Sequence, residues 1–498
     1  METRRPRPNL KLLSQYRAMI SYLGLMLGLA GSMMLLPLLV ILVWPEEQPY
    51  VVYFLVPGLV LMVGGTVVYY RFRQHDIVLT MQDGGLIVLL SWMGACLFSS
   101  WPLMAIEGLT FTQAVFEAVS GWTTTGLSVV DVTTAKHVTL LWRSTMQLIG
   151  GAGFAIIMLI ALAGPVGIGL PTAEGRGEQL LPHVRESARL VFLIYSVYVV
   201  VGIGAYRVAG MNWFDAVNHA FAAVSTGGFS TRPESIGGWN SIRIEAVSLP
   251  LMFLGNFNFL TAYLLWRGRV KAVLRNGEVR FVAVFLSLWA LLLFLLVCWG
   301  LYPSLEKSIR VAVFAAVTSI TTTGFSTVTY TNWNAFGILL LIIGMLIGGG
   351  VGSTAGGMKQ FRILLLCKAI GWEIRRALLP ASAVVEPSVW HGEERRYVSD
   401  TQLRGVAVFV FLYLLAGVVG TAILTAHGIP LQEAWFEFAS AQGTVGLSIG
   451  VTRPDAPSLV LWTQTVGMFL GRLEFLIVFE GIVKMWQDLP VLGRSFHS

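Results

Sequence analysis

A series of apolar runs, each about 20 residues long, restricts the fold of this 498-residue chain more than any other feature. A helix needs about 20 predominantly apolar residues to cross the hydrocarbon core of a bilayer. Ten runs of this kind begin near Ala18, Val51, Gly84, Val138, Ala188, Arg243, Phe281, Trp333, Leu403 and Pro457. Charged residues make up only 12% of the chain, whereas a soluble globular protein carries about 25%. The sequence therefore predicts an all-α polytopic membrane protein with ten spans, and it excludes a soluble or a disordered chain.

The positive charges indicate how such a protein is oriented. The chain has 34 Lys and Arg against 27 Asp and Glu, which gives a net charge of +7. If the N-terminus is cytoplasmic, most of the basic residues fall in loops on the inner side, as the positive-inside rule requires. We therefore expect both termini in the cytoplasm. This distribution explains the basic charge without a nucleic-acid partner.

An internal repeat is the second strong signal. Four segments align without gaps, namely S-G-W-T-T-T-G-L-S, A-A-V-S-T-G-G-F-S, S-I-T-T-T-G-F-S and A-Q-G-T-V-G-L-S, and they end at Ser128, Ser230, Ser326 and Ser448. Each has a threonine two positions before a glycine, then a bulky apolar residue, then the serine. Each unit is therefore expected to hold a spanning helix, a short helix, the glycine loop and a second spanning helix. The predicted divisions are an N-terminal helix pair at 1–74 and pore repeats at 75–175, 176–275, 276–395 and 396–498.

The repeated glycine loops have a chemistry that suits cations. Each follows a half-polar stretch, such as 110–122 or 431–442, that is too short to cross and is expected to be re-entrant. Non-helical backbone at membrane depth is tolerated where it lines a water-filled cavity. Four such loops on one axis would place rings of carbonyl oxygens that replace a cation's hydration shell. The alternative is that these Gly, Thr and Ser residues are only tight helix-packing sites.

A glycine-rich stretch interrupts the second helix of the third repeat. Six of the ten residues at 348–357 are glycine, and each would cost a continuous helix about 1 kcal/mol. A phosphate-binding loop is excluded, because Met358 precedes Lys359 and Gln360 follows it, which breaks the required G-K-[ST] pattern. We therefore predict a broken helix that lies across the pore beneath the third loop.

Arg472 is the one basic residue expected in the middle of a span, within the sequence G-R-L-E. An unpaired charge there costs about 2.5–3.5 kcal/mol, so the side chain should face the interior of the bundle. The expected partners are carbonyl groups at 349–353, or the carboxylates of Glu474 or Glu480. The alternative is a purely structural arginine that ties helices together.

Other polar residues in apolar surroundings have less specific signals. Glu117 and Glu437 lie nine residues before their loop glycines, where they could concentrate cations or simply be satisfied by hydrogen bonds. Asn256 and Asn258 are expected to form interhelical hydrogen bonds rather than to act as ligands. The histidines show no metal-ligand spacing, and no catalytic motif is present, so we predict no enzyme.

On these motifs the chain resembles the Trk/Ktr/HKT superfamily of potassium transporters, and most closely its TrkH/TrkG-type pore subunits, over nearly its whole length. The resemblance implies four pore repeats around one ion path, with the N-terminal pair as an addition. It implies a potassium-binding selectivity filter at Thr124, Thr125, Gly126, Thr226, Gly227, Gly228, Thr322, Thr323, Gly324, Thr444, Val445 and Gly446. It also implies a gate formed by Gly348, Gly349, Gly350, Gly352, Ser353, Thr354, Gly356, Gly357 and Arg472.

The resemblance further implies a function, an oligomeric state and a regulatory partner. The expected function is potassium uptake across the bacterial cytoplasmic membrane, through a selective, gated pore driven by the membrane potential. A proton- or sodium-coupled potassium symporter is the alternative, because coupled transporters also use broken helices. A homodimer is implied, together with a cytosolic TrkA-like ring of RCK domains that binds nucleotide. Potassium is the only ion or cofactor that we expect this chain to bind.

Overall fold

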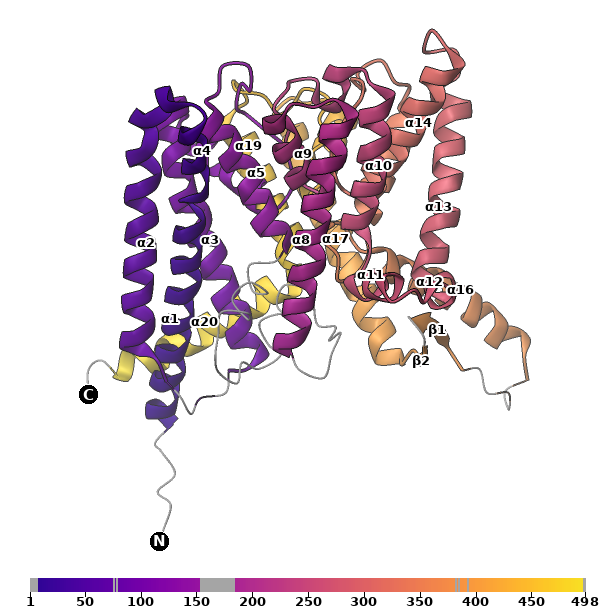
Figure 1. Cartoon of the computed structure of the whole chain (residues 1–498). Helices are drawn as coiled ribbons and strands as arrows, with labels where there is room; N and C mark the ends of the chain where they lie inside the picture. Colours follow the sequence, from indigo (N-terminus) through magenta and orange to yellow (C-terminus); the bar gives the residue numbers. More distant parts are fainter. Residues whose placement is uncertain are drawn as a thin grey trace.

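The computed structural model describes residues 8–74, 77, 79–152, 184–380, 383, 386–391 and 394–495. Apart from one antiparallel hairpin, β1 (Ser388–His391) and β2 (Glu394–Tyr397), the described regular structure is helical. Most of the long helices run roughly parallel to one another between two ends of the molecule (Figure 1). The prediction of an all-α polytopic architecture is confirmed.

The N-terminal pair consists of α1 (Pro8–Met33) and α2 (Val51–Phe72), joined by the short helical segments η1 (Leu36–Leu42) and η2 (Pro45–Tyr50). The two helices approach closely through glycines. A Cβ atom on Gly31 would overlap the carbonyl oxygen of Gly58, and one on Gly65 would overlap that of Gly24. Small residues allow such close backbone contact between membrane helices.

The remaining helices follow the fourfold pattern of the sequence. Unit one has α3 (Met81–Glu107), α4 (Phe111–Trp122) and α5 (His137–Ala152), and unit two has α8 (Val184–Ala209), α9 (Trp213–Val224), η3 (Ser235–Trp239), α10 (Ile242–Asn256), α11 (Phe259–Trp266) and α12 (Val270–Arg275). Unit three has α13 (Gly277–Leu293), η4 (Phe294–Cys298), α14 (Leu305–Ile320), α15 (Ala335–Ile347) and α16 (Gln360–Leu378). Unit four has α17 (Asp400–Ala426), α18 (Leu431–Gln442), α19 (Ser458–Leu473) and α20 (Phe475–Ser495). The expected boundary between the first two repeats, at residues 175 and 176, lies outside the described residues.

The short helices α4, α9, α14 and α18 begin at defined caps. The side chains of Thr110, Asn212 and Ser304 each accept a hydrogen bond from the amide three residues later, which satisfies an otherwise unpaired backbone donor. Pro430 precedes α18. These caps fix where each short helix starts and therefore where its C-terminal end lies.

Ten spans were predicted, and the second helices of units two and four are broken where no break was expected, whereas the predicted break in the second helix of unit three is found. Six described helices are long and apolar enough to cross a membrane, and a seventh span is counted if α10 and α11 are taken together across their 112° bend. Phe257 leaves the helical region between α10 and α11, α15 ends at Gly348, and α19 ends at Glu474, where φ is 58°. Breaks at single residues such as Phe257 and Glu474 do not interrupt an apolar run, so hydrophobicity alone cannot reveal them. In unit one, α5 ends at the border of the described residues.

The four units are arranged in a closed ring. In each unit the second helix packs against the short helix of the next, so that α5 contacts α9, α10 contacts α14, and α15 contacts α18. The last contact, α19 with α4, returns to unit one. This order places the four glycine loops around a common centre.

The C-terminal helix α20 turns away from the ring and runs beneath the N-terminal part of the fold (Figure 1). It packs on α3 and α1. Lys484 lies 3.2 Å from Asp83, and the Tyr16 hydroxyl donates to Asp488 at 2.9 Å. The helix thus links the end of unit four to the N-terminal pair.

Candidate ion pore and gate

The four short helices end in the same backbone geometry. The amide of the residue before each loop glycine donates to the carbonyl five residues earlier, which reverses the chain sharply. The threonines that carry the reversal have left-handed backbone, with φ of 56° at Thr124, 52° at Thr226, 52° at Thr322 and 50° at Thr444. The glycines have φ of 92° at Gly126, 75° at Gly228, 82° at Gly324 and 95° at Gly446. A positive φ is costly for β-branched threonine, and strain of this kind concentrates at functional sites.

The loops meet so closely that only glycine fits at their contact points. A Cβ atom on each loop glycine would overlap a backbone carbonyl oxygen of the next unit in the ring. The overlapping pairs are Gly126 with Gly227, Gly228 with Thr323, Gly324 with Val445 and Gly446 with Thr125. Four carbonyl groups, one from each unit, therefore surround one axis. Such a ring supplies oxygen ligands to a dehydrated cation.

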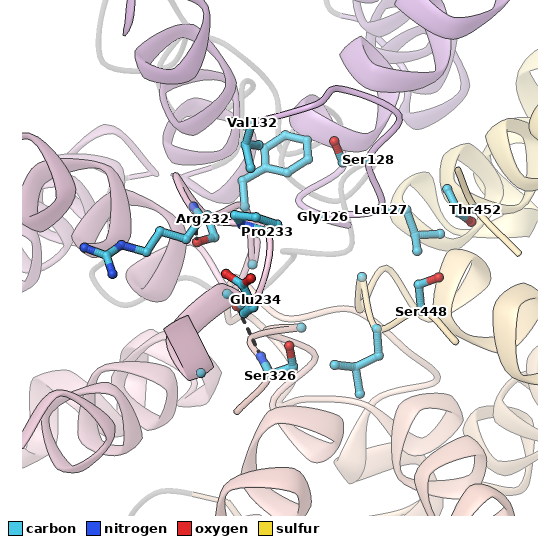
Figure 2. Close-up of a pocket in the computed structure, with 18 of the residues that line it drawn as sticks. Gly126, Leu127, Ser128, Val132, Arg232, Pro233, Glu234, Ser326, Ser448 and Thr452 are labelled. Carbon is cyan, nitrogen blue, oxygen red and sulfur yellow. Dashed lines mark hydrogen bonds between the residues drawn. The ribbon is translucent and has the colours of Figure 1, made fainter. Parts of the chain in front are cut away.

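A cavity of about 660 Å³ opens on one side of this ring, and all four loop glycines line it. Figure 2 shows residues of all four units around it, from Gly126 and Ser128 to Ser326 and Ser448. Asp131 also lines the cavity, and hydrogen bonds from the side chain and amide of Thr133 lower the pKa of its carboxyl group. The carboxylate therefore stays ionised at neutral pH, which favours cations at this mouth.

The serine of the repeated motif binds the short helix of its own unit. The Ser128 hydroxyl donates to Glu117 at 2.9 Å, and that of Ser448 donates to Glu437. The amides of Val129 and Ile449 donate to the same two carboxylates at 2.9 Å. Both carboxylates are fully buried and satisfied, so they brace the loops rather than face the cavity.

Units two and three vary this brace. In unit two the position is His219, whose Nε2 lies 3.0 Å from the Ser230 hydroxyl oxygen. In unit three it is Ala315, which offers no partner, and the Ser326 amide donates instead to the Ser235 hydroxyl oxygen of unit two. The motif is therefore fourfold in backbone but not in side-chain chemistry.

Two buried polar residues on α5 connect unit one to the loop of unit two, and sequence reasoning missed both. The Arg143 guanidinium donates to Glu117 at 2.7 Å and lies 4.0 Å from the centre of the Phe229 ring. Gln147 donates through Nε2 to the Gly227 carbonyl, which belongs to the ring, and accepts from the Phe229 amide at 3.2 Å. Their polar character within an apolar run was the available signal.

We predict that Gln147→Leu weakens ion selectivity, because the Gly227 carbonyl loses the donor that orients it. Removing one such buried hydrogen bond costs about 1–3 kcal/mol. Competition between rubidium and sodium for uptake into liposomes measures the effect. Gln464→Leu is the matched control: Gln464 is equally buried on α19 but binds Thr452. Equal selectivity in the two variants would contradict the role of Gln147.

The glycine-rich stretch at 348–357 lies against the other side of the ring. The Gly356 amide donates to the Thr322 hydroxyl oxygen at 2.7 Å, and the Thr354 and Thr226 hydroxyl oxygens are 3.2 Å apart. A Cβ atom on Gly356 would overlap the hydroxyl oxygen of Thr444. We call residues 348–357 the intramembrane loop. It covers the ring on this side and contacts threonines of units two, three and four.

Two of the loop threonines keep unpaired hydroxyl groups. Thr124 and Thr444 are fully buried, and within the described residues their hydroxyl oxygens have no hydrogen-bond partner. A buried polar atom without a protein partner is costly unless something else satisfies it. Thr124 and Thr444 are therefore candidate ligands for a bound group.

Arg472 fastens the intramembrane loop to unit one. Its Nη1 donates to the Thr354 carbonyl at 2.7 Å, and its Nη2 donates to the Gly150 carbonyl. The prediction of a carbonyl partner at 349–353 is thus wrong by one residue. The second partner, the Gly150 carbonyl, was not predicted. The loop thus contacts units two, three and four, and Arg472 of unit four connects it to unit one.

In the part of the chain that the structure describes, neither expected carboxylate is among the hydrogen-bond partners shown for Arg472. The Glu474 carboxylate accepts two hydrogen bonds of 2.8 Å from Arg362 instead, and Glu480 is exposed. The reason is that Arg472 lies in the last turn of α19 rather than in the middle of a span. The chain turns at Glu474, and its carboxylate pairs with Arg362 of α16 instead.

Comparisons with known proteins agree with this geometry. The family model described as "TrkH: Cation transport protein" matches residues 53–488. The chain is 33% identical to the Trk system potassium uptake protein TrkH of Halomonas elongata, over 93% of this chain and 97% of the relative. It is 32% identical to the Trk system potassium uptake protein TrkG of Escherichia coli K12, over 94% and 98%. The crystal structure of the potassium transporter TrkH from Vibrio parahaemolyticus superposes with a TM-score of 0.82 at 29% identity, and covers 94% of this chain and 98% of that one. The chain therefore belongs to the TrkH family of cation transport proteins.

Proposed function

We propose that this protein conducts potassium into the cell through the ring of glycine loops, driven by the membrane potential. The observation that carries the proposal is the closed ring of backbone carbonyls from Thr125, Gly227, Thr323 and Val445. Carbonyl rings replace the hydration shell of a potassium ion. Each 100 mV of potential contributes about 2.3 kcal/mol per charge to inward movement. Relatives that are named potassium uptake proteins support the choice of ion.

The proposed path has three successive parts. Ions collect in the 660 Å³ outer cavity, lose water at the carbonyl ring, and then meet the threonine hydroxyls on its inner side. The proposed potassium ligands are therefore Thr124, Thr125, Gly126, Thr226, Gly227, Gly228, Thr322, Thr323, Gly324, Thr444, Val445 and Gly446. The partly negative C-terminal ends of the short helices point toward this region and favour a cation.

The intramembrane loop and Arg472 form the proposed gate. The loop lies on the ion path, and the positive guanidinium repels a cation that reaches it. Opening requires the loop to leave the threonines of the ring. Arg472 then acts as an electrostatic barrier and as a latch on Thr354.

An uncoupled pore explains the buried carboxylates better than a coupled symporter does. A proton relay needs titratable side chains along the path. Glu117 and Glu437 each accept several hydrogen bonds behind the loops, which leaves neither of them facing the ring.

We further propose that the protein lies in the bacterial cytoplasmic membrane with both termini inside. The end of the fold that carries α11, α12 and α16 exposes basic residues, among them Arg267, Lys271, Arg275 and Arg375 (Figure 1). Basic residues at one end of a polytopic protein mark the cytoplasmic side. This surface suits the RCK-domain partner that the family resemblance implies, and the same resemblance implies a homodimer.

Growth of a bacterium that lacks its own potassium uptake systems tests the proposal. Expression of this chain, with a TrkA-type partner, should restore growth at low potassium, while empty vector should not. Purified protein in liposomes should take up rubidium at a rate that does not depend on an imposed pH gradient. Absence of both rescue and uptake would overturn the proposal, and uptake that requires the pH gradient would favour the symporter.

A further inference from the structure

The intramembrane loop is held at a second place, remote in sequence from its contact with Arg472. The Gly350 amide donates to two oxygens of Asn256. These are the side-chain oxygen, at 3.2 Å, and the backbone carbonyl oxygen, at 3.3 Å. The next amide, of Val351, donates to the Glu278 carboxylate at 3.0 Å. Asn256 and Glu278 are 1% and 4% exposed. Two consecutive amides of the loop are thus bound by side chains of two other helices.

Asn256 has the same place in unit two that Arg472 has in unit four. Each directly follows a glycine that packs against the backbone carbonyl of the last turn of its own short helix. These pairs are Gly255 with Val224 and Gly471 with Gln442, and both carbonyl residues lie four positions before the loop glycine. Units two and four are opposite each other in the ring. Equivalent residues on opposite sides therefore hold the loop.

The local geometry is built for this contact. A Cβ atom on Gly350 would lie 2.7 Å from the Asn256 carbonyl oxygen and 3.4 Å from a carboxylate oxygen of Glu278, so a larger residue would force the loop away. Glu278 lies in the first turn of α13, where the helix dipole favours its negative charge. A carboxylate that accepts from a backbone amide forms one of the stronger hydrogen bonds available to a protein.

We propose that Asn256 and Glu278 are positioning residues that form a second anchor of the gate. They hold residues 350 and 351 so that Thr354 and Gly356 stay beneath the ring, and this contact has to break for the pore to conduct. The proposal rests on the proposed function, because it assigns these residues to the gate of that pore. It also gives Asn256 a specific task within the interhelical hydrogen bonds expected from the sequence.

The test is rubidium uptake by the full chain in liposomes, without a partner. Glu278→Leu removes the acceptor, and we expect about tenfold higher basal uptake, because losing a charge-assisted hydrogen bond shifts the closed state by about that factor. Glu278→Gln keeps an acceptor oxygen and should restore uptake to near the unmodified level. Glu373→Leu is the control, since Glu373 is an exposed carboxylate on α16. A purely structural role predicts unchanged or lower uptake, so the sign of the change separates the two.

Unchanged uptake in Glu278→Leu, or equal increases in Glu278→Leu and Glu373→Leu, would overturn the anchor. If Glu278→Leu does not elute from size-exclusion chromatography as a single species, Asn256→Ala is tested in its place. It should raise uptake by the same factor, and unchanged uptake would overturn the anchor. Failure of the proposed function looks different, because neither the unmodified protein nor Arg472→Ala would then take up rubidium. If those two proteins take up rubidium but Asn256→Ala and Glu278→Leu leave the basal uptake unchanged, the anchor is rejected and the proposed function stands.

Discussion

Replacing Gly324 with serine should lower the preference of the pore for potassium over sodium by about tenfold or more, which corresponds to about 1.4 kcal/mol. Gly324 has φ of 82°, and a Cβ atom there would overlap the carbonyl oxygen of Val445. That carbonyl belongs to the ring, so it has to move to admit the new side chain. A displaced carbonyl no longer matches its three counterparts, and the smaller sodium ion gains relative to potassium. Rubidium and sodium uptake into liposomes gives the ratio.

Gly428→Ser provides a closely matched control. Gly428 has almost the same backbone, with φ of 84°, but nothing lies within 4 Å of a Cβ atom there. Both substitutions carry the backbone strain of serine at positive φ, about 1–3 kcal/mol. Only Gly324→Ser disturbs the ring. Unchanged selectivity in Gly324→Ser, or an equal loss in Gly428→Ser, would show that the glycine loops are not the filter.

Arg472→Ala is expected to raise basal rubidium uptake by about ten- to a hundredfold in the absence of any partner. The substitution removes the hydrogen bonds to the Thr354 and Gly150 carbonyls together with a positive charge below the ring. Hydrogen bonds from a charged donor contribute about 1.5–3 kcal/mol each, and about 1.4 kcal/mol corresponds to a factor of ten. The rate of uptake per reconstituted protein measures the effect.

Two further substitutions make this result specific. Arg472→Lys keeps the charge but has a single ammonium group, so it should release the loop in part and give an intermediate rate. Arg453→Ala removes an exposed arginine that pairs with Asp455, and it should leave uptake unchanged. A rate in Arg472→Ala equal to that of the unmodified protein would assign Arg472 to helix packing alone.

The sequence was most informative where one chemical pattern occurred four times. The alignment of Gly126, Gly228, Gly324 and Gly446 identified the loops, because the same backbone reversal needs the same residue types in each unit. The glycine content of residues 348–357 likewise predicted a break, since no stable helix tolerates it. The family was recognisable from these motifs, and the comparisons confirm it.

Contacts between units could not be predicted in this way. Gln147 and Arg143 act on the loop of the next unit, and nothing in their own segment reveals which loop they reach. The partner of Arg472 was misjudged because the turn at Glu474 depends on one left-handed residue. Asn256 was recognised as an interhelical residue, but its link to Gly350 joins segments that are far apart in the chain. Such pairs are fixed by packing, which local periodicity does not encode.

The position of the intramembrane loop, in one of four similar units, has a consequence for how a ring of this kind can be assembled. In a complex of four identical subunits, any segment that reaches the rotation axis meets three copies of itself there. A plug on the axis would then be excluded by its own symmetry mates. Here the four quarters belong to one polypeptide and can differ, so within the described residues it is unit three that places a segment against the ring, where units two and four supply side chains that bind it. Joining the repeats in one chain thus permits a segment on the axis that strict rotational symmetry would exclude.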